Sequence, residues 1–530
     1  MKCLSTFLCR WRLLALKMMF CAAVVLVPPA GAQTLVAAMN GGLRALDPIV
    51  STTVVTSVHA FMVYDMLLGQ DASGKVQPQM ASWQVSPDGK AFTFTLREGL
   101  KWHDGTKVTA EDCIASIRRW GGVDVMGQAV MGMVAGIRAV DERTFVVILN
   151  HASDLLLEAL SKPSSRQAVM MPRRLAETPA TQAVKENIGS GPFRFVASEF
   201  KPGVRAVYEK FKDYVPRKEP ASGSAGGKAV HVDRVEWVTM PDNLTAVNAL
   251  ISGEIDFLEF VPYDLLPMVE GKRGVQTGVL NKLGNWNMFR MNFLYPPFNN
   301  GKIRQAAMYA VGQQEVLQAL VGNPKYFKTC VAVFGCGLPY ESSYGRDIIV
   351  PAQPDRARAL LKEAGYDGTP VVLLHPSDHP FGSPQPLVIA QQLRNAGFTV
   401  QMQTSDWQAL TARRGNQKPP SEGGWNMFVT FSAVGDQSDP IRSLLIGAAG
   451  RKSWFGWPDV PAIEEARLKF GLAAGAAERK KLAEDVQRLV VDEGVLVPLG
   501  QYVFPSAWST KVSGMPEFSR PVFWGVRKSG

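Results

Sequence analysis

One run of residues, Met80–Cys113, places the strongest local constraints on how this chain can fold. Within it, Asp88-Gly89 is a tight-turn dipeptide, because glycine adopts positive φ angles without steric cost. Phe92, Phe94 and Leu96 then alternate with threonines, which is the period of two that a half-buried strand has. The first half of the run therefore predicts a β-hairpin.

The second half of the run predicts a turn followed by a capped helix. Asp104-Gly105 repeats the turn dipeptide, and Thr109 is a residue type that caps helix N-termini. Asp112, three residues on, can accept from the backbone N–H of Thr109, and Glu111 lies in the electropositive first turn. Each of these residues has a role in folding, and we assign none of them a catalytic role.

Length and charge narrow the class of protein. The chain of 530 residues is too long for one ordinary core, so two or three domains are expected. Hydrophobic residues make up 46% of it and charged residues 20%, which is typical of a soluble globular protein. The net charge is +10, but the basic residues are scattered and form no stripe interleaved with aromatic residues. We therefore expect no nucleic-acid partner.

Residues 1–32 have the features of a secretory signal peptide. Their apolar stretch, Met18–Val27, is too short to span a bilayer, and Ala30-Gly31-Ala32 fits a small-x-small cleavage site. The basic region before it contains Lys2, Arg10, Arg12 and Lys17. We expect export to the periplasm with cleavage near Ala32; an uncleaved anchor is the alternative, and the context of Cys21 does not fit a lipoprotein signal.

Three cysteines remain after residue 32, and their spacing fits neither a redox CxxC motif nor a zinc site. Cys330 and Cys336 bracket a short loop, so in an oxidising compartment we expect them to form a disulfide. Cys113 is left over in an apolar helical stretch, where a buried free thiol is expected.

The sequence contains none of the common enzyme motifs. It lacks G-x-S-x-G, H-E-x-x-H, a Walker sequence and a dinucleotide fingerprint in a strand–helix context. Ile188–Phe193 is rich in glycine but lacks the following Lys-Ser/Thr, so it is interpreted as a turn. His375 and His379 are separated by Pro376 and do not share a helical face, so no metal or cofactor is expected. A binding function is favoured over catalysis.

The run Met80–Cys113 also resembles a known family, the bacterial extracellular solute-binding proteins of family 5, which are the dipeptide and oligopeptide receptors of ABC importers. Cys113 departs from the family, which has an aliphatic residue there. The residues that carry the resemblance are Trp83, Ser86, Asp88, Gly89, Leu96, Arg97, Gly99, Trp102, His103, Asp104, Gly105, Thr109, Ala110, Glu111 and Asp112. Weaker matches follow at Asn292, Pro297, Phe298, Arg304, Gln305 and Ala306.

This resemblance implies an α/β protein with the two-lobed, type II fold of periplasmic binding proteins, a hinge and an extra small α/β domain. It implies a first lobe from residues 33–65, 187–284 and 507–530, a small extra domain from 66–186, and a second lobe from 285–506. The two hinge crossings are expected near Gly284–Met288 and Gly500–Ser506.

Patterns outside the run predict further elements. An apolar helix is expected over Val54–Leu68 and a core strand over Thr144–Leu149. Asp242 suits the cap of a helix that Gly253 ends. Strand, helix and strand over Val371–Leu374, Leu387–Asn395 and Phe398–Met402 imply a parallel sheet in the second lobe.

Asp436 is the leading candidate for ligand binding. It follows a predicted strand, Trp425–Phe431, and ligands of open α/β lobes gather at the carboxyl ends of strands. In peptide-binding members of the resembling family, a similar segment supplies a carboxylate that pairs with the peptide's α-ammonium group; Asp436 matches its first acidic position and Asp439 its second. The alternative is that both residues only organise the turn.

The other candidate site residues are inferred only from their positions in the sequence. Arg290 follows the predicted hinge and could bind a ligand carboxylate, although a structural role is the alternative. Trp286, Trp425 and Phe381 are candidates for lining the cleft, and core packing explains each of them equally well.

The resulting hypothesis is a monomeric periplasmic receptor that captures a di- or oligopeptide between its lobes and delivers it to an inner-membrane ABC permease. It is not expected to be an enzyme. The alternatives within the same role are an opine, a modified amino acid, a sugar or a nickel chelate. The competing classes are an exported hydrolase and a structural or adhesive envelope protein.

Overall fold

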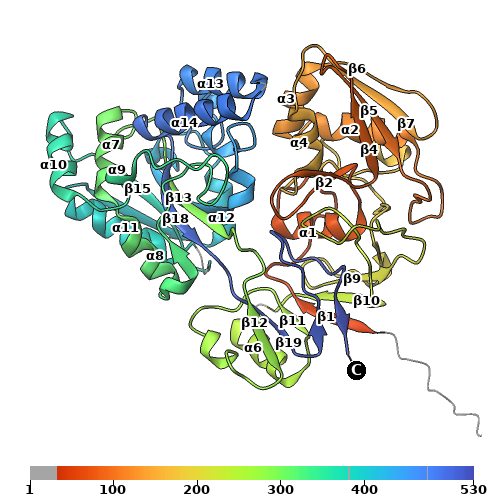
Figure 1. Cartoon of the computed structure of the whole chain (residues 1–530). Coiled ribbons are helices and arrows are strands. Elements are labelled where there is room, and N and C mark those ends of the chain that lie inside the picture. Colours follow the sequence, from red (N-terminus) through yellow and green to blue (C-terminus); the bar gives the residue numbers. More distant parts are fainter. Residues whose placement is uncertain (1–32, 241, 380–381, 474, 530) are drawn as a thin grey trace, which may run out of the picture. The chain divides into compact units, whose positions relative to one another are not determined.

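Three larger β-sheets organise the residues that the computed structural model describes, which are 33–240, 242–379, 382–473 and 475–529 (Figure 1). We call the part around the seven-stranded sheet lobe I, the part around the six-stranded sheet lobe II, and the part around the four-stranded sheet the small domain. Two short ribbons pair β2 (Leu68–Gln70) with β3 (Val76–Pro78), and β20 (Val512–Ser513) with β21 (Arg527–Lys528). This architecture is the α/β class that the sequence predicted.

Lobe I is a mixed sheet around β1 (Thr34–Ala38), which runs parallel to β10 (Arg234–Val238) and to β11 (Phe257–Leu258). Antiparallel pairings add β8 (Phe193–Phe195), β9 (Arg205–Lys210), β12 (Val275–Gly278) and β19 (Ser506–Ser509). Helix α6 (Asn243–Ser252) begins and ends as predicted: Asp242 accepts from the Thr245 N–H at 2.6 Å, and Gly253 ends the helix with φ +83°.

Lobe II has the strand order β14-β18-β13-β17-β15-β16. The predicted β-α-β unit is confirmed, because β15 (Val371–Pro376) and β16 (Val400–Ser405) are parallel and α11 (Pro384–Asn395) joins them. The sheet as a whole is mixed, however. Strand β13 (Asn285–Met291) is antiparallel to β17 (Met427–Ala433) and to β18 (Val497–Tyr502), which is itself antiparallel to β14 (Phe327–Lys328).

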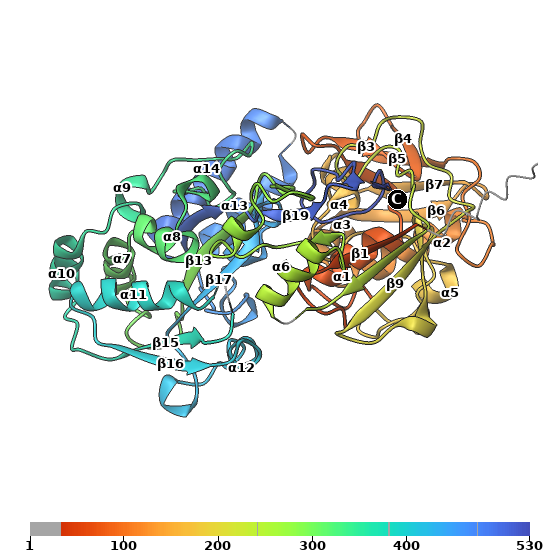
Figure 2. The same cartoon turned by 90° about the horizontal axis from the view of Figure 1, so that it is seen from below.

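The other helices of lobe II lie around its sheet, and Figure 2 shows α10 beside α7, on which it packs. They are α7 (Gly301–Ala310), α8 (Gln313–Val321), α9 (Arg346–Ile349), α10 (Pro354–Glu363), α12 (Trp407–Arg413), α13 (Pro461–Leu472) and α14 (Ala476–Asp492). Short 3₁₀ turns occur at Ala197–Glu199, Leu266–Met268, Pro324–Tyr326, Pro420–Glu422, Val434–Gln437, Leu444–Ile446 and Gly450–Lys452. No helix in the described part of the chain has the length and apolar character needed to cross a bilayer.

The small domain contains the predicted hairpin and capped helix. Strands β4 (Ala81–Val85) and β5 (Ala91–Leu96) pair antiparallel, and β7 (Thr144–Leu149) and β6 (Val134–Ala139) extend the sheet. The cap of α2 (Ala110–Gly121) is reciprocal: the Thr109 side chain accepts from the Asp112 N–H, and Asp112 accepts from the Thr109 N–H at 2.8 Å. Helices α3 (Val125–Met133), α4 (Leu155–Ser161) and α5 (Arg173–Ala176) complete the domain.

Helix α1 (Val54–Val63) is shorter than the predicted Val54–Leu68, and the contact that follows it explains the difference. The Gly191 N–H donates to the Val63 carbonyl at 2.9 Å, and a Cβ on Gly189 would lie 2.1 Å from the same oxygen. Beyond the helix, Tyr64 is extended and the Leu67 carbonyl accepts from the Gln79 N–H. The Gly-Ser-Gly turn thus packs backbone to backbone on the helix end, and glycine is required for that approach.

The chain crosses between lobes I and II twice, at 279–284 and at 503–505. The two segments are neighbours: the Gln501 side chain donates to the Leu283 carbonyl at 3.3 Å, and a Cβ on Gly284 would lie 2.2 Å from the Tyr502 carbonyl oxygen. Gly284 also has φ +70°, so glycine suits this position both for its backbone conformation and for the close approach to Tyr502. Two adjacent connections of this kind suit a hinge.

The predicted disulfide between Cys330 and Cys336 is present, with Cα atoms 5.9 Å apart. Buried glutamines hold both of its ends. The Gln313 amide donates to the Cys330 carbonyl at 2.9 Å, and the Gln501 side chain accepts from the Cys336 N–H. Cys113 is a buried free thiol, as predicted, and burial raises its pKa.

The buried imidazole of His59 on α1 gives the fold a testable pH dependence. It is fully buried beside the Tyr208 hydroxyl, 2.9 Å from Nδ1, and burial lowers its pKa to about 3. In the unfolded chain the pKa of His59 is near 6.5. Its contribution to the unfolding free energy is therefore fully present above that pH and is lost as the pH falls toward 3. As the pH falls from 7 to 5, protonation of His59 in the unfolded chain should lower the unfolding free energy by about 2 kcal/mol.

Urea titrations at several pH values measure this contribution, comparing the wild type with His59→Gln. The variant should show a shallower pH slope, whatever its absolute stability. His231→Gln, at a partly exposed position, is the control and should keep most of the slope. Equal slopes for wild type and His59→Gln would contradict the assignment.

Candidate functional site

A cavity of about 790 Å³ lies between lobe II and the small domain. Its walls come from lobe II, from the small domain and its β2–β3 turn, and from the segments near the crossings. Charged residues of both signs line it: Asp71, Lys75, Glu158, Lys282, Asp439, Arg442 and Glu517. A cavity of this volume is in the range of small-molecule sites.

A second cavity of about 210 Å³ adjoins the first, because Leu280, Asn281, Phe518 and Ser519 line both. Its apolar wall consists of Val54, Phe260, Phe431, Phe504 and Pro521, and its polar wall includes Glu259, His379 and Arg520. His379 packs against the rings of Trp407 and Phe431, with centroids 4.4 and 5.1 Å away. Burial lowers the pKa of His379 to about 4, so its ring is neutral near pH 7.

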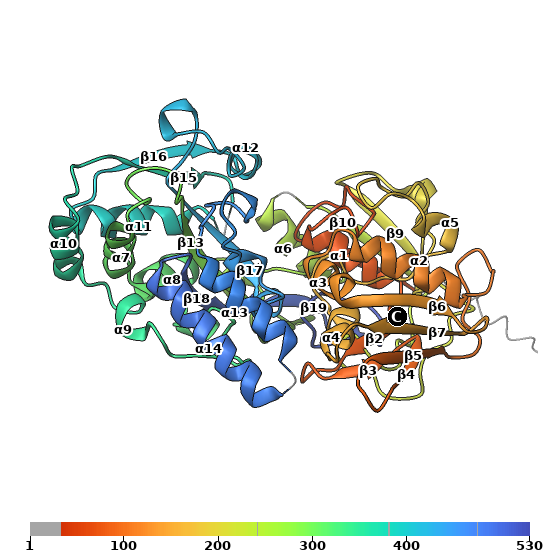
Figure 3. The same cartoon turned by 90° about the horizontal axis from the view of Figure 1, so that it is seen from above.

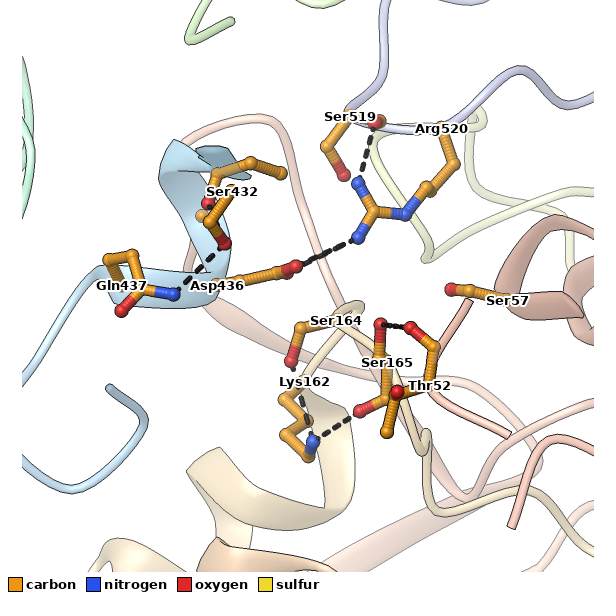
Figure 4. Close-up of polar contacts among 12 residues, drawn as sticks. Thr52, Ser57, Lys162, Ser164, Ser165, Ser432, Asp436, Gln437, Ser519 and Arg520 are labelled. Atoms are coloured by element: carbon orange, nitrogen blue, oxygen red, sulfur yellow. Dashed lines mark hydrogen bonds and ion pairs between the residues drawn. The ribbon is translucent and has the colours of Figure 1, made fainter. Parts of the chain in front are cut away.

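Asp436 lies at the predicted position, in the turn that follows strand β17, and it is paired with an arginine of the C-terminal segment. The Arg520 Nη2 atom lies 3.1 and 3.3 Å from the two carboxylate oxygens of Asp436 (Figure 4). Asp436 belongs to lobe II, whereas Arg520 lies in the segment between β19 and β21, so this pair bridges the lobes. Asp436 itself lines neither cavity; its neighbour Gly435 lines the larger one, and Arg520 lines the smaller one.

Hydroxyl-bearing residues surround the pair. Figure 4 shows Thr52, Ser57, Ser164 and Ser165 below the Asp436–Arg520 pair and Ser432 and Gln437 beside it. The Ser165 hydroxyl donates to the Thr52 carbonyl at 3.0 Å, and the Gln437 amide donates to the Ser432 hydroxyl at 2.9 Å. These groups can donate or accept hydrogen bonds, but none of them lines either of the two cavities described above.

A second ion pair joins the small domain to lobe II beside the larger cavity, which Glu158 lines. The Arg479 guanidinium on α14 donates to the Glu158 carboxylate on α4 at 2.6 Å. Burial raises the pKa of Glu158, and Arg479 opposes that rise. Nearby, the Ser153 hydroxyl donates to the Gly471 carbonyl at 3.3 Å. Figures 1 and 3 agree that α13 and α14 approach α3 and α4.

Asp439, the second predicted acidic residue, is close to Asp436 but organises its own turn. Its side chain is 4% exposed, and its Oδ1 accepts from the N–H groups of Ile441 and Arg442 at 2.9 and 2.7 Å. It lines the larger cavity. The turn role, which the sequence left as the alternative, is thus visible for Asp439.

Arg290 is buried within lobe II, where backbone carbonyls occupy its guanidinium. It donates to the carbonyls of Phe455, Leu445 and Val495 at 2.6, 2.9 and 2.7 Å, and it lies over the Trp454 ring. Arg290 lines neither of the two cavities described above. The structural alternative fits this environment, in which desolvation lowers its pKa to about 9.

The predicted aromatic residues do not meet at the cavities. Trp425 is fully buried beside Phe428 and Trp457, and its indole donates to the Arg414 carbonyl at 3.2 Å. Trp286 is buried in strand β13, and neither tryptophan lines either cavity. Phe381 lies outside the described residues.

The sequence analysis missed three residues that line the cavities, Arg520, Glu259 and Glu158, and also Arg479, which pairs with Glu158. The local sequence pattern around each of these residues indicates secondary structure but no binding site. Arg520 follows Phe518-Ser519 in a stretch predicted simply to return to lobe I. Only the three-dimensional pairing with Asp436 distinguishes Arg520 from other basic residues.

Comparison with known proteins identifies the architecture. Residues 75–452 match the sequence model of the bacterial extracellular solute-binding proteins, family 5. A protein of Sinorhizobium fredii (strain NBRC 101917 / NGR234), named a probable peptide ABC transporter periplasmic-binding protein, is 39% identical over 491 residues. That alignment covers 92% of each chain.

Two solved structures share the fold. A dipeptide-binding protein from Pseudoalteromonas sp. SM9913, in complex with Met-Leu, superposes with a TM-score of 0.79 at 20% identity, covering 94% of this chain and 100% of the other. The binding protein AgaA from Agrobacterium tumefaciens R10, in complex with agropinic acid, superposes with a TM-score of 0.77 at 24% identity. That superposition covers 94% of this chain and 99% of AgaA. The type II periplasmic binding fold predicted from the sequence is thus confirmed.

Proposed function

We propose that this chain, which belongs to the bacterial extracellular solute-binding proteins of family 5, is the solute receptor of an ABC importer and captures a small peptide between its lobes. The observation that carries the proposal is the 790 Å³ cavity, whose walls come from lobe II, the small domain and the segments near the crossings, and which is lined by Gly435 and Ser519, the neighbours of the Asp436–Arg520 pair. The peptide class follows the named function of the Sinorhizobium relative.

Binding would work by closure about the two connections, 279–284 and 503–505. An open form admits the solute, and contacts from both walls of the cleft then favour the closed form, so that ligand shifts the population. Glu158–Arg479 and Asp436–Arg520 join the two sides and would stabilise closure. No bond of the solute is made or broken in this cycle.

The setting of the protein follows from the same proposal. The chain would be exported to the periplasm, would act as a monomer, and would deliver its solute to an inner-membrane permease complex. The named relative is a periplasmic-binding protein, which supports this location. Residues 1–32, the expected signal peptide, lie outside the described residues.

An opine or another modified amino acid is the second candidate solute. The specific observation in its favour is the cation beside Asp436. Arg520 can pair with a ligand carboxylate, and the amino terminus of an ordinary peptide has no such group. The likeness to AgaA shows the fold alone and leaves the solute open.

A thermal-shift screen of residues 33–530 tests the proposal. Peptides, opines, sugars and nickel chelates are added separately, and mass spectrometry identifies any solute recovered. We expect a rise in melting temperature with peptides, because a ligand at 100 times its Kd adds about 2.7 kcal/mol of stability. A shift only with sugars or chelates would keep the receptor role but overturn the peptide assignment.

A further inference from the structure

The smaller cavity contains a buried cation whose hydrogen-bonding capacity is only partly used. Arg520 is 3% exposed, its Nη1 donates to the Ser519 carbonyl at 3.2 Å, and its Nη2 donates to Asp436. Its Nε has no acceptor among the described residues. Leaving a buried guanidinium donor without an acceptor is costly, so an anionic acceptor from a ligand would be favourable there.

Two acidic groups lie near this cation. Asp436 is its ion-pair partner, and Glu259 lines the same cavity, with its Oε2 accepting from the Asn40 N–H at 2.7 Å. Each carboxylate retains acceptor capacity, because a carboxylate has about four lone-pair sites when ionised; burial raises the pKa of Glu259, and Arg520 opposes that rise. The cavity can therefore receive an ammonium group and a carboxylate next to one another.

We propose that the smaller cavity is the head subsite of the peptide receptor, and that it takes an amine bearing a carboxylate on the same carbon, the zwitterionic head of an α-amino acid. This inference rests on the proposed function and specifies its substrate class. The carboxylate accepts from Arg520, and the ammonium group donates to Asp436 or Glu259. The remainder of the solute extends into the adjoining larger cavity, past Leu280 and Phe518, which line both.

The size of the subsite agrees with this assignment. A volume of about 210 Å³ accommodates an amino-acid head but not a whole dipeptide with large side chains. The aromatic wall formed by Phe260 and Phe504 can cover the methylene groups of the head. Peptides joined through a side-chain carboxyl, such as γ-glutamyl peptides, present such a head, whereas ordinary α-peptides present an ammonium beside a neutral amide.

Isomeric dipeptides test the proposal without a change in composition or net charge. Calorimetric titration compares γ-glutamyl-leucine with α-glutamyl-leucine, and the corresponding glycine and phenylalanine pairs. We expect the wild type to bind the γ-isomers at least about tenfold more tightly, because a carboxylate makes a stronger, charge-assisted bond to Arg520 than a neutral amide oxygen makes. In Arg520→Gln the preference should fall below about threefold, mainly through weaker binding of the γ-isomers.

Two further variants separate recognition from folding. Arg520→Lys keeps the charge but not the guanidinium geometry, so it should retain part of the preference if Arg520→Gln fails to fold. Arg234→Gln removes an arginine that pairs with Glu199 and Glu236 in lobe I and lines neither cavity, so it should leave the preference unchanged.

The possible results distinguish failure of the head subsite from failure of the peptide-receptor function. Equal binding of the isomers by the wild type, or a preference that survives in folded Arg520→Gln, would overturn the head subsite while the peptide receptor stands. Binding of neither isomer, with saturable binding of a non-peptide solute, would overturn both. A γ-preference that depends on Arg520 supports both.

Discussion

Replacing Asp436 with asparagine is expected to weaken binding of a peptide with a free amino terminus by about 30- to 150-fold, or about 2–3 kcal/mol. The variant removes the anion that can pair with the ligand's ammonium group, and it also removes the partner that Arg520 has across the lobes. Calorimetric titration of the wild type and of Asp436→Asn measures the effect.

The control ligand is the same peptide with its amino terminus acetylated. Because it has no ammonium group, its affinity should differ by less than about threefold between wild type and Asp436→Asn. The double variant Asp436→Asn/Arg520→Gln shows how much of the effect comes from the unpaired guanidinium. Equal losses for the free and acetylated peptides would rule out Asp436 as the ammonium partner.

The second large effect is expected at Arg290, on stability and not on binding. Arg290→Met leaves the carbonyls of Phe455, Leu445 and Val495 without their donor in a buried place. We expect the unfolding free energy to fall by about 3–5 kcal/mol, as measured by urea denaturation. Gly456, at φ +98°, allows the close approach, since a Cβ there would lie 2.5 Å from Arg290 Nε.

Binding measurements decide between the two roles considered for Arg290. If the residue is structural, folded Arg290→Met should bind peptide within about threefold of wild type. Arg290→Lys is the matched control: it keeps the charge but offers fewer directed donors, so it should recover only part of the lost stability. Unchanged stability with strongly weakened binding would restore the carboxylate-binding hypothesis.

The sequence predicted best those features that depend on neighbouring residues. The cap at Thr109 and Asp112 and the helix end at Gly253 each result from side-chain or backbone chemistry within a few positions. The disulfide between Cys330 and Cys336 joins residues only six apart. Such local rules operate whatever the rest of the chain does, so a pattern is sufficient to recognise them.

Features that depend on distant segments were predicted less well. Helix α1 ends early because Gly189 and Gly191, more than a hundred residues away, pack on its last turn. Asp436 was found because it follows a strand, but its partner Arg520 is 84 positions further on. Glu158 and Arg479 are 321 positions apart. No periodicity links residues at such separations, and only the tertiary fold brings them together.

Native mass spectrometry of residues 33–530, incubated for hours with a peptide that stabilises the protein, separates a receptor from an enzyme. We predict a saturable complex of one peptide per chain, whose peptide mass stays unchanged with time and whose signal falls in Asp436→Asn. Fragments of the peptide that accumulate in proportion to protein and time would contradict a receptor function and establish an exported hydrolase.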